Sequence, residues 1–297
     1  MSRTVIAPVS YGLGDLVVSL PAFQALIAAG DPVWLLARAP SQRLLAERIE
    51  GLGGVLDEDS YAQGPGDRFT DLRDHPLQRD FWWGSAEFEA VFGPLNINDI
   101  LGRICADLGV PADFRQPIPL QSFPRPGLDT TVLLVHETDG SAKSWPPDRW
   151  AELAALLRAD GHDVAHVTKG TGPTPLDDIG VVRLVASTPP AVVDMLSACR
   201  AVIGVDTGVT HIAVQQGTPT VTICRRASVY VRPWPKSAAL RGSACTDLCR
   251  AAERASAYNQ TVNLRDFRPS QRTCPSGSAC LTGVRAADAV ALLQDLL

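Results

Sequence analysis

The sequence predicts an α/β protein made of two Rossmann-like domains that face each other across a cleft. Short apolar and β-branched runs alternate with amphipathic segments of helical period, which is the pattern of a parallel sheet with covering helices. The alternation is interrupted at residues 111–126, where five prolines fall within sixteen positions and hold the backbone extended. We therefore expect an N-terminal domain at residues 1–125 and a C-terminal domain at residues 126–297, with room for the last helix to pack back on the first domain.

In the first domain, the segment after the first strand carries apolar residues such as Leu16 and Leu20 on one face, as an amphipathic helix does. Residues 51–79 are polar and weakly periodic, so we expect irregular structure there, with at most a short strand near Val55. The aromatic run at 81–83 fits either a strand or a loop. The other expected elements are strands at 4–8 and 33–37 and helices at 15–29, 41–49 and 98–108.

The second domain repeats the alternation more regularly. Ligands of open parallel sheets bind beyond the carboxyl ends of the strands. The loops after residues 8, 135, 168 and 205 are therefore the places where chemistry is expected. The expected strands span 131–135, 163–168, 181–185, 201–205 and 220–224, and the expected helices span 147–159, 190–198, 209–215 and 286–297.

Composition and charge exclude several classes of protein. The chain has 297 residues, of which 45% are hydrophobic and 20% charged, as in globular proteins. Its net charge of −5 argues against a sequence-independent grip on nucleic-acid phosphates. No apolar run reaches the roughly 18 residues of a membrane span, and the N-terminus lacks the features of a signal peptide. We expect a cytoplasmic protein.

The first candidate site is the turn after the first strand, which contains Gly12, Gly14 and Asp15. Glycines let a ligand approach the backbone closely, and the N-terminus of a helix attracts negative groups. Asp15 is either a cap of the following helix or a carboxylate that takes a proton from a hydroxyl group, and the two roles are compatible.

The second candidate site is the loop at residues 136–147, which precedes a helix. Lys143 is one of only three lysines in the chain, and its charge could neutralise a diphosphate. Ser141 and Ser144 could donate hydrogen bonds to phosphate oxygens. The alternative is an exposed polar loop without a ligand.

The third candidate site is the turn at Asp206, Thr207 and Gly208, between a strand and a helix. The free amides at the start of that helix form an anion site, and Asp206 could orient them or bind a ligand hydroxyl. His211 follows Thr207 by about one helical turn. A histidine at such a position is more often a packed, hydrogen-bonded residue than a catalyst.

The seven cysteines fall into two groups. Three lie in apolar segments, where we expect buried thiols: Cys105, Cys199 and Cys224. Four lie in a polar tail with C-x3-C and C-x5-C spacing, which leaves open either a structural zinc or iron site or thiols without a metal: Cys245, Cys249, Cys274 and Cys280.

Three arginines, Arg225, Arg226 and Arg232, lie close together in the sequence after the strand at 220–224. They fit a surface that faces a phosphate or an acidic acceptor, since guanidinium groups bind oxyanions in a bidentate manner. A solvated basic surface without a ligand fits them equally well.

Four segments in a fixed order carry a family resemblance: G-L-G-D-L-V-V-S-L-P-A-F-Q-A-L at 12–26, K-S-W-P-P-D-R-W-A-E-L at 143–153, V-I-G-V-D-T-G-V-T-H-I-A-V-Q-Q-G-T-P-T-V-T-I at 202–223 and C-P-S-G-S-A-C-L-T-G-V at 274–284. Together they resemble the heptosyltransferase-like glycosyltransferases, glycosyltransferase family 9. The second and third segments are specific in combination, whereas residues 51–125 carry little resemblance.

The resemblance implies a GT-B fold and inverting transfer of a heptose from ADP-L-glycero-β-D-manno-heptose without a catalytic metal. The acceptor would be a lipopolysaccharide-type saccharide, a small molecule or a protein, and some relatives that modify proteins carry a Cys-held iron. Asp15 would be the general base and His211 a support of the donor turn. The donor-binding set would be Gly12, Gly14, Ser141, Lys143, Ser144, Asp206, Thr207, Gly208 and His211.

One departure leaves the nucleotide open. In many family members an acidic residue in the loop after the strand at 163–168 binds the ribose. Here residues 169–175 contain no acid, and Asp177 and Asp178 come only afterwards. Two other functions also stay open, a nucleotide-sugar epimerase-like enzyme and a non-catalytic nucleotide-sugar-binding protein.

Overall fold

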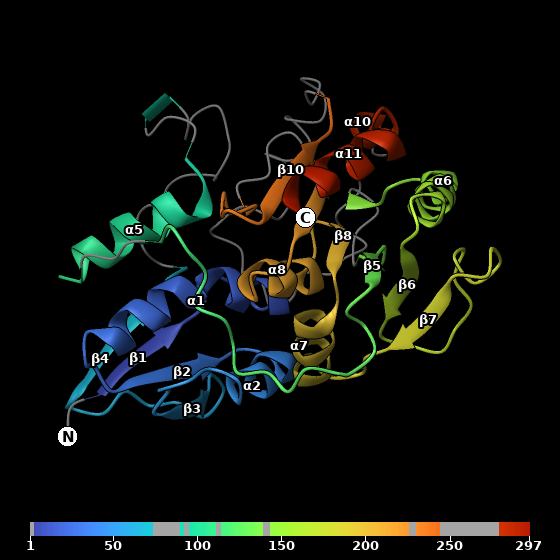
Figure 1. Cartoon of the computed structure of the whole chain (residues 1–297). Helices are drawn as coiled ribbons and strands as arrows, with labels where there is room; N and C mark the ends of the chain where they lie inside the picture. The colour runs from blue at the N-terminus through green and yellow to red at the C-terminus, as the bar shows by residue number, and fades with distance from the viewer. Residues whose placement is uncertain are drawn as a thin grey trace.

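The computed structural model describes residues 3–73, 90–91, 95–110, 114–138, 143–225, 230–243 and 279–297. Their backbone forms two parallel sheets, a four-stranded sheet in the order β3-β2-β1-β4 and a six-stranded sheet in the order β10-β9-β8-β5-β6-β7 (Figure 1). Helices cover the sheets, as the crossover connections between parallel strands require. The predicted α/β class is therefore confirmed.

The smaller sheet and its helices come from the first part of the chain, drawn in blue to green in Figure 1. The expected helix at 98–108 begins one residue earlier, because the Asn96 side chain accepts hydrogen bonds from Asn98 N and Asp99 N and so caps it. The aromatic run at 81–83 lies outside the described residues. The elements are β1 (Arg3–Ala7), α1 (Leu13–Ala28), β2 (Val33–Ala37), α2 (Pro40–Ala46), β3 (Gly54–Asp57), β4 (Asp67–Asp71) and α5 (Ile97–Asp107).

Strand β4 lies in the segment that was expected to be irregular. Its polar sequence lacks the apolar pattern of a buried strand, but it pairs with β1 in parallel from Arg3↔Asp67 to Ala7↔Asp71. The first of these pairs is also an ion pair, in which Arg3 Nε and Nη2 donate to the two Asp67 oxygens at 2.8 and 3.0 Å. This hydrogen bond from Arg3 lowers the pKa of Asp67 to about 2.

Replacing Asp67 by Asn should remove a stabilisation that depends on pH. The folded-state pKa of about 2 lies below the ordinary value of about 3.9. The contribution is therefore complete above pH 4 and is lost as the pH falls through 2. In urea unfolding, the variant should be less stable than the natural protein at pH 7, and the difference in their free energies of unfolding should be smaller at pH 3. A difference that does not depend on pH would contradict the role given to Asp67.

The larger sheet comes from the second part of the chain. Its elements match the expected boundaries within a residue or two, and two elements were not expected, the half-buried edge strand β10 and the short helix α10. They are β5 (Thr131–Val135), α6 (Pro147–Ala159), β6 (Asp163–Thr168), β7 (Val182–Val185), α7 (Pro189–Ala198), β8 (Ala201–Val205), α8 (Gly208–Gln215), β9 (Thr220–Cys224), β10 (Ser237–Arg241), α10 (Ala279–Thr282) and α11 (Ala286–Leu296).

The last helix corrects one expectation. Helix α11 does not return to the first sheet but packs against α6 and against strands β8, β9 and β10. Its buried side chains, which include Val290 and Leu293, belong to the apolar cluster on that side of the larger sheet. The helix is thus part of the second half of the molecule.

The two halves share an apolar core. Helices α1 and α8 lie side by side in the centre of the molecule (Figure 1). One cluster of fully buried side chains runs from Leu20 and Phe23 on α1 to Ile212 and Ala213 on α8. Burial of apolar surface stabilises this contact, so the helices that begin at the two candidate turns are held against each other.

Candidate active site

The N-termini of α1 and α8 meet through two glycines. A Cβ atom added to Gly208 would lie 2.9 Å from Gly14 N, and one added to Gly14 would lie 3.2 Å from Gly208 Cα. Both atoms belong to the backbone, so neither side has room for a side chain. The close neighbour of Gly14 in the structure is the start of helix α8, and the predicted donor-binding role of Gly12 and Gly14 stays a prediction.

Asp15 caps helix α1. Its Oδ2 accepts a hydrogen bond of 2.8 Å from Gly12 N, three residues earlier, which satisfies one of the free amides at the helix start. The carboxylate is partly exposed, and the next residue towards the N-terminus is Gly14, which touches Gly208. The capping role is confirmed, and the role of Asp15 as a base stays a prediction.

Asp206 joins the second and third candidate sites. Lys143 Nζ donates to Asp206 O at 3.1 Å and lies 3.5 Å from Asp206 Oδ2. The other carboxylate oxygen, Oδ1, lies 2.9 Å from His211 Nε2. Asp206 and His211 are nearly fully buried, whereas Lys143 is partly exposed. The structure therefore brings together three residues that span 68 positions of the chain, from Lys143 to His211.

His211 is held in its neutral form. Burial is the largest cause that lowers its pKa, and the charges of Arg232 and Lys143 lower it further, against the effect of Asp206. A carboxylate only accepts hydrogen bonds, so the single imidazole proton lies on Nε2 and is donated to Asp206. The Asp206 carboxylate thus lies between Lys143 and His211.

Thr207 and the serines differ in what surrounds them. Thr207 is the N-cap residue of α8, and its Oγ1 is buried without a hydrogen-bond partner among the described residues. A buried hydroxyl next to free helix amides suits an oxyanion. Ser144 is exposed, and Ser141 lies outside the described residues.

Glu137 is a further candidate site residue, which sequence reasoning did not single out. It follows β5, and its Oε1 accepts from Thr168 Oγ1 at 2.6 Å while Oε2 accepts from Lys169 N at 3.2 Å. It therefore supplies a carboxylate at the end of β6, the place where the loop at 169–175 has none. Strands β5 and β6 are neighbours, and their pairing is the only feature that could have pointed to Glu137.

Asp177, the nearest acid in the sequence after that loop, has a structural role. Its carboxylate accepts hydrogen bonds from Thr174 N at 2.6 Å and from Arg183 Nε at 3.0 Å. The Arg183 guanidinium is the main reason why the pKa of Asp177 lies well below its usual range. The carboxylate also lies 3.1 Å from Nε2 of the buried His166. These bonds engage both oxygens in holding the loop.

Arg232 corrects the expectation of a basic surface. It is fully buried, and burial lowers its pKa to about 9. Its Nη2 donates to His211 O at 2.8 Å, its Nη1 donates to Gln215 Oε1 and, at 3.4 Å, to Val17 O. Arg225 is half-buried, and Arg226 lies outside the described residues.

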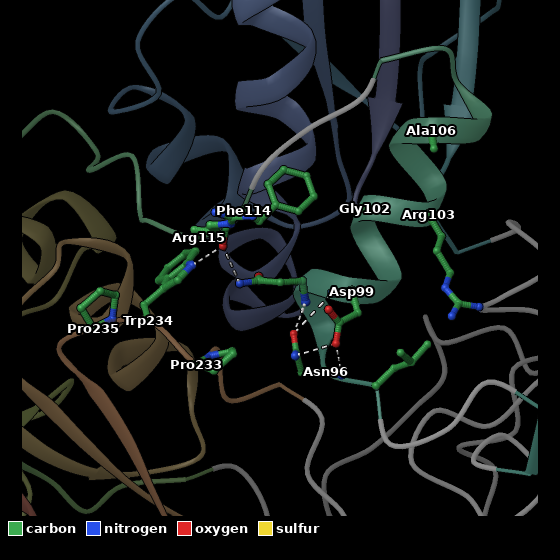
Figure 2. A pocket seen from close by; sticks show the side chains of 12 residues that line it. Asn96, Asp99, Gly102, Arg103, Ala106, Phe114, Arg115, Pro233, Trp234 and Pro235 are labelled. Carbon is green, nitrogen blue, oxygen red and sulfur yellow. Dashed lines mark hydrogen bonds between the residues drawn. The ribbon is translucent and has the colours of Figure 1, made fainter.

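A pocket of about 770 Å³ lies between α5 and residues 233–235 (Figure 2). Trp234 forms part of its wall and is fixed by a 2.6 Å hydrogen bond from Nε1 to Phe114 O. The pocket combines aromatic rings, amides and charged groups, a set that can hold a polar ligand such as a saccharide. Its lining is Leu95, Asn96, Asn98, Asp99, Gly102, Arg103, Ala106, Phe114, Arg115, Pro233, Trp234 and Pro235.

The cysteines of the apolar segments are buried thiols, as predicted: Cys105, Cys199 and Cys224. Of the tail cysteines, the structure describes Cys280 alone, which is buried. Cys245, Cys249 and Cys274 lie outside the described residues, so a metal site there stays a prediction. Elsewhere in the described ranges, no three His, Cys, Asp or Glu residues form a group suited to a metal ion. No described helix is long and apolar enough to cross a membrane.

Comparisons with known proteins give a family model that matches part of the chain and solved structures that share its fold. The model of glycosyltransferase family 9 (heptosyltransferase) matches residues 183–255. The chain has the fold of TibC, an iron-containing dodecameric glycosyltransferase from enterotoxigenic E. coli (18% identity, 99% of this chain, 76% of that chain, TM-score 0.67). No curated protein sequence matches the chain.

Two further structures are similar over the full length. One is a family 9 glycosyltransferase from Veillonella parvula (12% identity, 99% of this chain, 97% of that chain, TM-score 0.65). The other is E. coli heptosyltransferase WaaC with ADP (12% identity, 99% of this chain, 100% of that chain, TM-score 0.60). The family model thus supports the resemblance to glycosyltransferase family 9 over residues 183–255, and the whole chain has the GT-B fold of these glycosyltransferase structures.

Proposed function

We propose that the protein is an inverting glycosyltransferase that moves a heptose-type sugar from a nucleotide diphosphate sugar, with ADP-heptose as the first candidate, to an acceptor hydroxyl without a catalytic metal. The observation that carries the proposal is the contact of Gly14 with Gly208. It supports the proposal because Asp15 follows Gly14 on α1, whereas Gly208 follows the Asp206–Thr207 turn on the other half of the molecule.

The donor side supplies positive charge to a leaving diphosphate. Lys143 is partly exposed and is held near Asp206 at 3.5 Å, so it can turn to a phosphate oxygen without crossing the site. The free amides at the start of α8 and the unpartnered Thr207 hydroxyl are further donors. Such fixed donors stabilise the charge that develops on the diphosphate as its bond to the sugar breaks.

The acceptor side supplies the base. The acceptor oxygen forms a bond to the anomeric carbon while the bond from that carbon to the diphosphate oxygen breaks on the opposite face. The hydroxyl proton passes to Asp15, and the nucleoside diphosphate leaves. Attack from the face opposite the leaving group inverts the anomeric centre, so the base must lie on the acceptor side of that carbon. Asp15 on α1 and the donor turn before α8 come from different halves of the molecule, which fits this arrangement.

Glu137 suggests where the nucleoside of the donor binds. The resemblance places an acidic ribose ligand after β6, and Glu137 is the carboxylate near that strand end, 2.6 Å from Thr168 Oγ1. We therefore place the nucleoside over the carboxyl ends of β5 and β6.

The function is tested by a binding screen followed by product analysis. ADP-, GDP- and UDP-sugars are compared by thermal shift, because a ligand of the folded state raises the melting temperature by mass action. The best donor is then incubated alone and with saccharide acceptors. A transferase forms a new glycosidic bond only with an acceptor. A changed sugar nucleotide or free sugar without an acceptor would favour the epimerase-like alternative, and binding with no product would favour a binding protein.

Replacing Lys143 by Ala should weaken donor binding about 10- to 100-fold, since a charged hydrogen bond to phosphate is lost. Isothermal titration with ADP and the donor sugar measures the effect. The matched control is Lys236→Ala, an exposed lysine in the segment before β10, which should bind the donor normally. Unchanged affinity in the Lys143 variant would remove this residue from the site.

A further inference from the structure

The guanidinium of Arg232 is completely buried between α1 and α8. Among the described residues it meets only neutral groups: two backbone carbonyls, the Gln215 side-chain oxygen and the face of Trp234, whose ring centroid lies 4.2 Å away. A buried charge without a carboxylate partner is costly. The partners it does have therefore deserve a functional explanation.

Those partners belong to the two halves of the candidate site. Val17, which accepts from Arg232 at 3.4 Å, follows Asp15 by two residues on α1. His211, whose carbonyl accepts at 2.8 Å, is the residue whose imidazole binds Asp206. One planar guanidinium thus ties the backbone of the helix that bears the base to the backbone of the helix that bears the donor turn.

Gln215 of α8 adds hydrogen bonds to this link between the two helices. Its Oε1 accepts from Arg232, while its Nε2 donates to Ile118 O at 2.8 Å and to Gln24 Oε1 of α1 at 3.3 Å. Because Arg232 has several donors in a rigid fork, it binds both helices at once, which the single ammonium of a lysine cannot do in the same way.

We propose that Arg232 is a positioning residue of the transfer reaction. It holds α1 against α8 so that Asp15 faces the donor bound at residues 206–208, and it places a fixed positive charge beside the His211–Asp206 pair. The proposal rests on the proposed glycosyltransferase function.

The positive charge of Arg232 lowers the pKa of His211. The charged groups around this imidazole are Asp206 from the turn before α8, Lys143 from the loop before α6 and Arg232 from the segment before β10; from α1, the nearest position is Gly14, where an added Cβ would lie 3.5 Å from the ring. Burial is the main reason why His211 stays neutral, and the charges of Arg232 and Lys143 act in the same direction, against the effect of Asp206. Without Arg232, protonation of His211 becomes easier, and it then competes with Lys143 for Asp206.

Three variants test the proposal. Arg232→Met removes the charge and both helix contacts, and Arg232→Lys keeps the charge. The matched control is Arg48→Met, since Arg48 also joins the two halves, by a 2.9 Å ion pair with Asp194 and a hydrogen bond to Gln121 O, but away from Asp206 and His211. Kinetics are measured per folded molecule, and the His211 ring is titrated by NMR, with its signal assigned from a His211→Gln variant.

We expect kcat to fall about tenfold or more in Arg232→Met, because a small displacement of the base is enough for such a loss, while the donor KM changes less than about threefold. The His211 pKa should rise in Arg232→Met and stay low in Arg232→Lys, whose kcat is reduced because one helix contact is missing. Arg48→Met should lose stability but keep kcat.

Several results would overturn the proposal. A normal kcat in both Arg232 variants, or an equal loss in Arg48→Met, would leave Arg232 as a packing residue only. An unchanged His211 titration in Arg232→Met would remove the charge effect. If Arg232→Met does not fold, a normal kcat in Arg232→Lys decides against positioning. If the natural protein transfers no sugar, the proposed function fails, while the His211 titration still reports on the role of the Arg232 charge.

Discussion

Replacing Asp15 by Asn should lower kcat for sugar transfer by about 10²- to 10⁴-fold, the usual contribution of a general base. An amide oxygen can still accept the hydrogen bond from Gly12 N that caps α1, so the fold and the donor site should stay intact. It cannot take the proton of the acceptor hydroxyl. The rate is measured with saturating donor and acceptor, and donor affinity is measured by calorimetry.

The matched control for Asp15 is Asp288, which is also an acid in the first turn of its helix. It lies on α11, where Arg285 Nε donates to its carboxylate at 2.9 Å, far along the fold from α1. Asp288→Asn should transfer sugar at the natural rate. If the Asp15 variant binds the donor and also transfers as fast as the natural protein, Asp15 is a helix cap and the base lies elsewhere.

Replacing Gly208 by Ala should destabilise the protein by about 1–3 kcal/mol, the usual cost of an inserted methyl group in a packed site, and should also impair transfer. The new Cβ would lie 2.9 Å from Gly14 N and 3.3 Å from Leu13 Cβ, so α8 must move away from α1. Urea unfolding gives the stability, and transfer is measured on the folded fraction.

Gly283→Ala is the control for this substitution, because a Cβ atom there meets no atom within 4 Å. Its stability should stay within about 0.5 kcal/mol of the natural protein. A Gly208 variant with natural stability and natural transfer would show that the close approach of α1 and α8 is not required.

The elements of the second half were predictable from local pattern. Strands β5, β6, β8 and β9 are short segments rich in apolar and β-branched residues, as strands buried on both faces of a parallel sheet tend to be, and the structure places them at the expected residues. Strand β4 was missed because its sequence, Asp67–Asp71, is polar and it has one neighbour, β1. Its position depends on pairing with β1 and on the ion pair with Arg3, neither of which local periodicity reveals.

The residues of the candidate site also divide into those with a local sequence signature and those without one. The turns at Asp15 and Asp206 were predictable, because glycines and a cap residue after a buried strand have a local signature. Glu137 and Arg232 were not, since each acts on a partner from another element: Glu137 on Thr168 in the neighbouring strand, and Arg232 on two helices at once.

By itself, the chain's order of residues determined the alternation of strands and helices and the turns at Asp15 and Asp206, because these depend on neighbours a few positions apart. Only the tertiary structure decided that α1 and α8 touch through Gly14 and Gly208, that α11 stays with the larger sheet and that the Arg232 charge is buried. The physical reason is that packing and burial depend on groups that are distant in the chain. A charged side chain can be buried in spite of the cost of its desolvation when carbonyl groups in the core accept its hydrogen bonds.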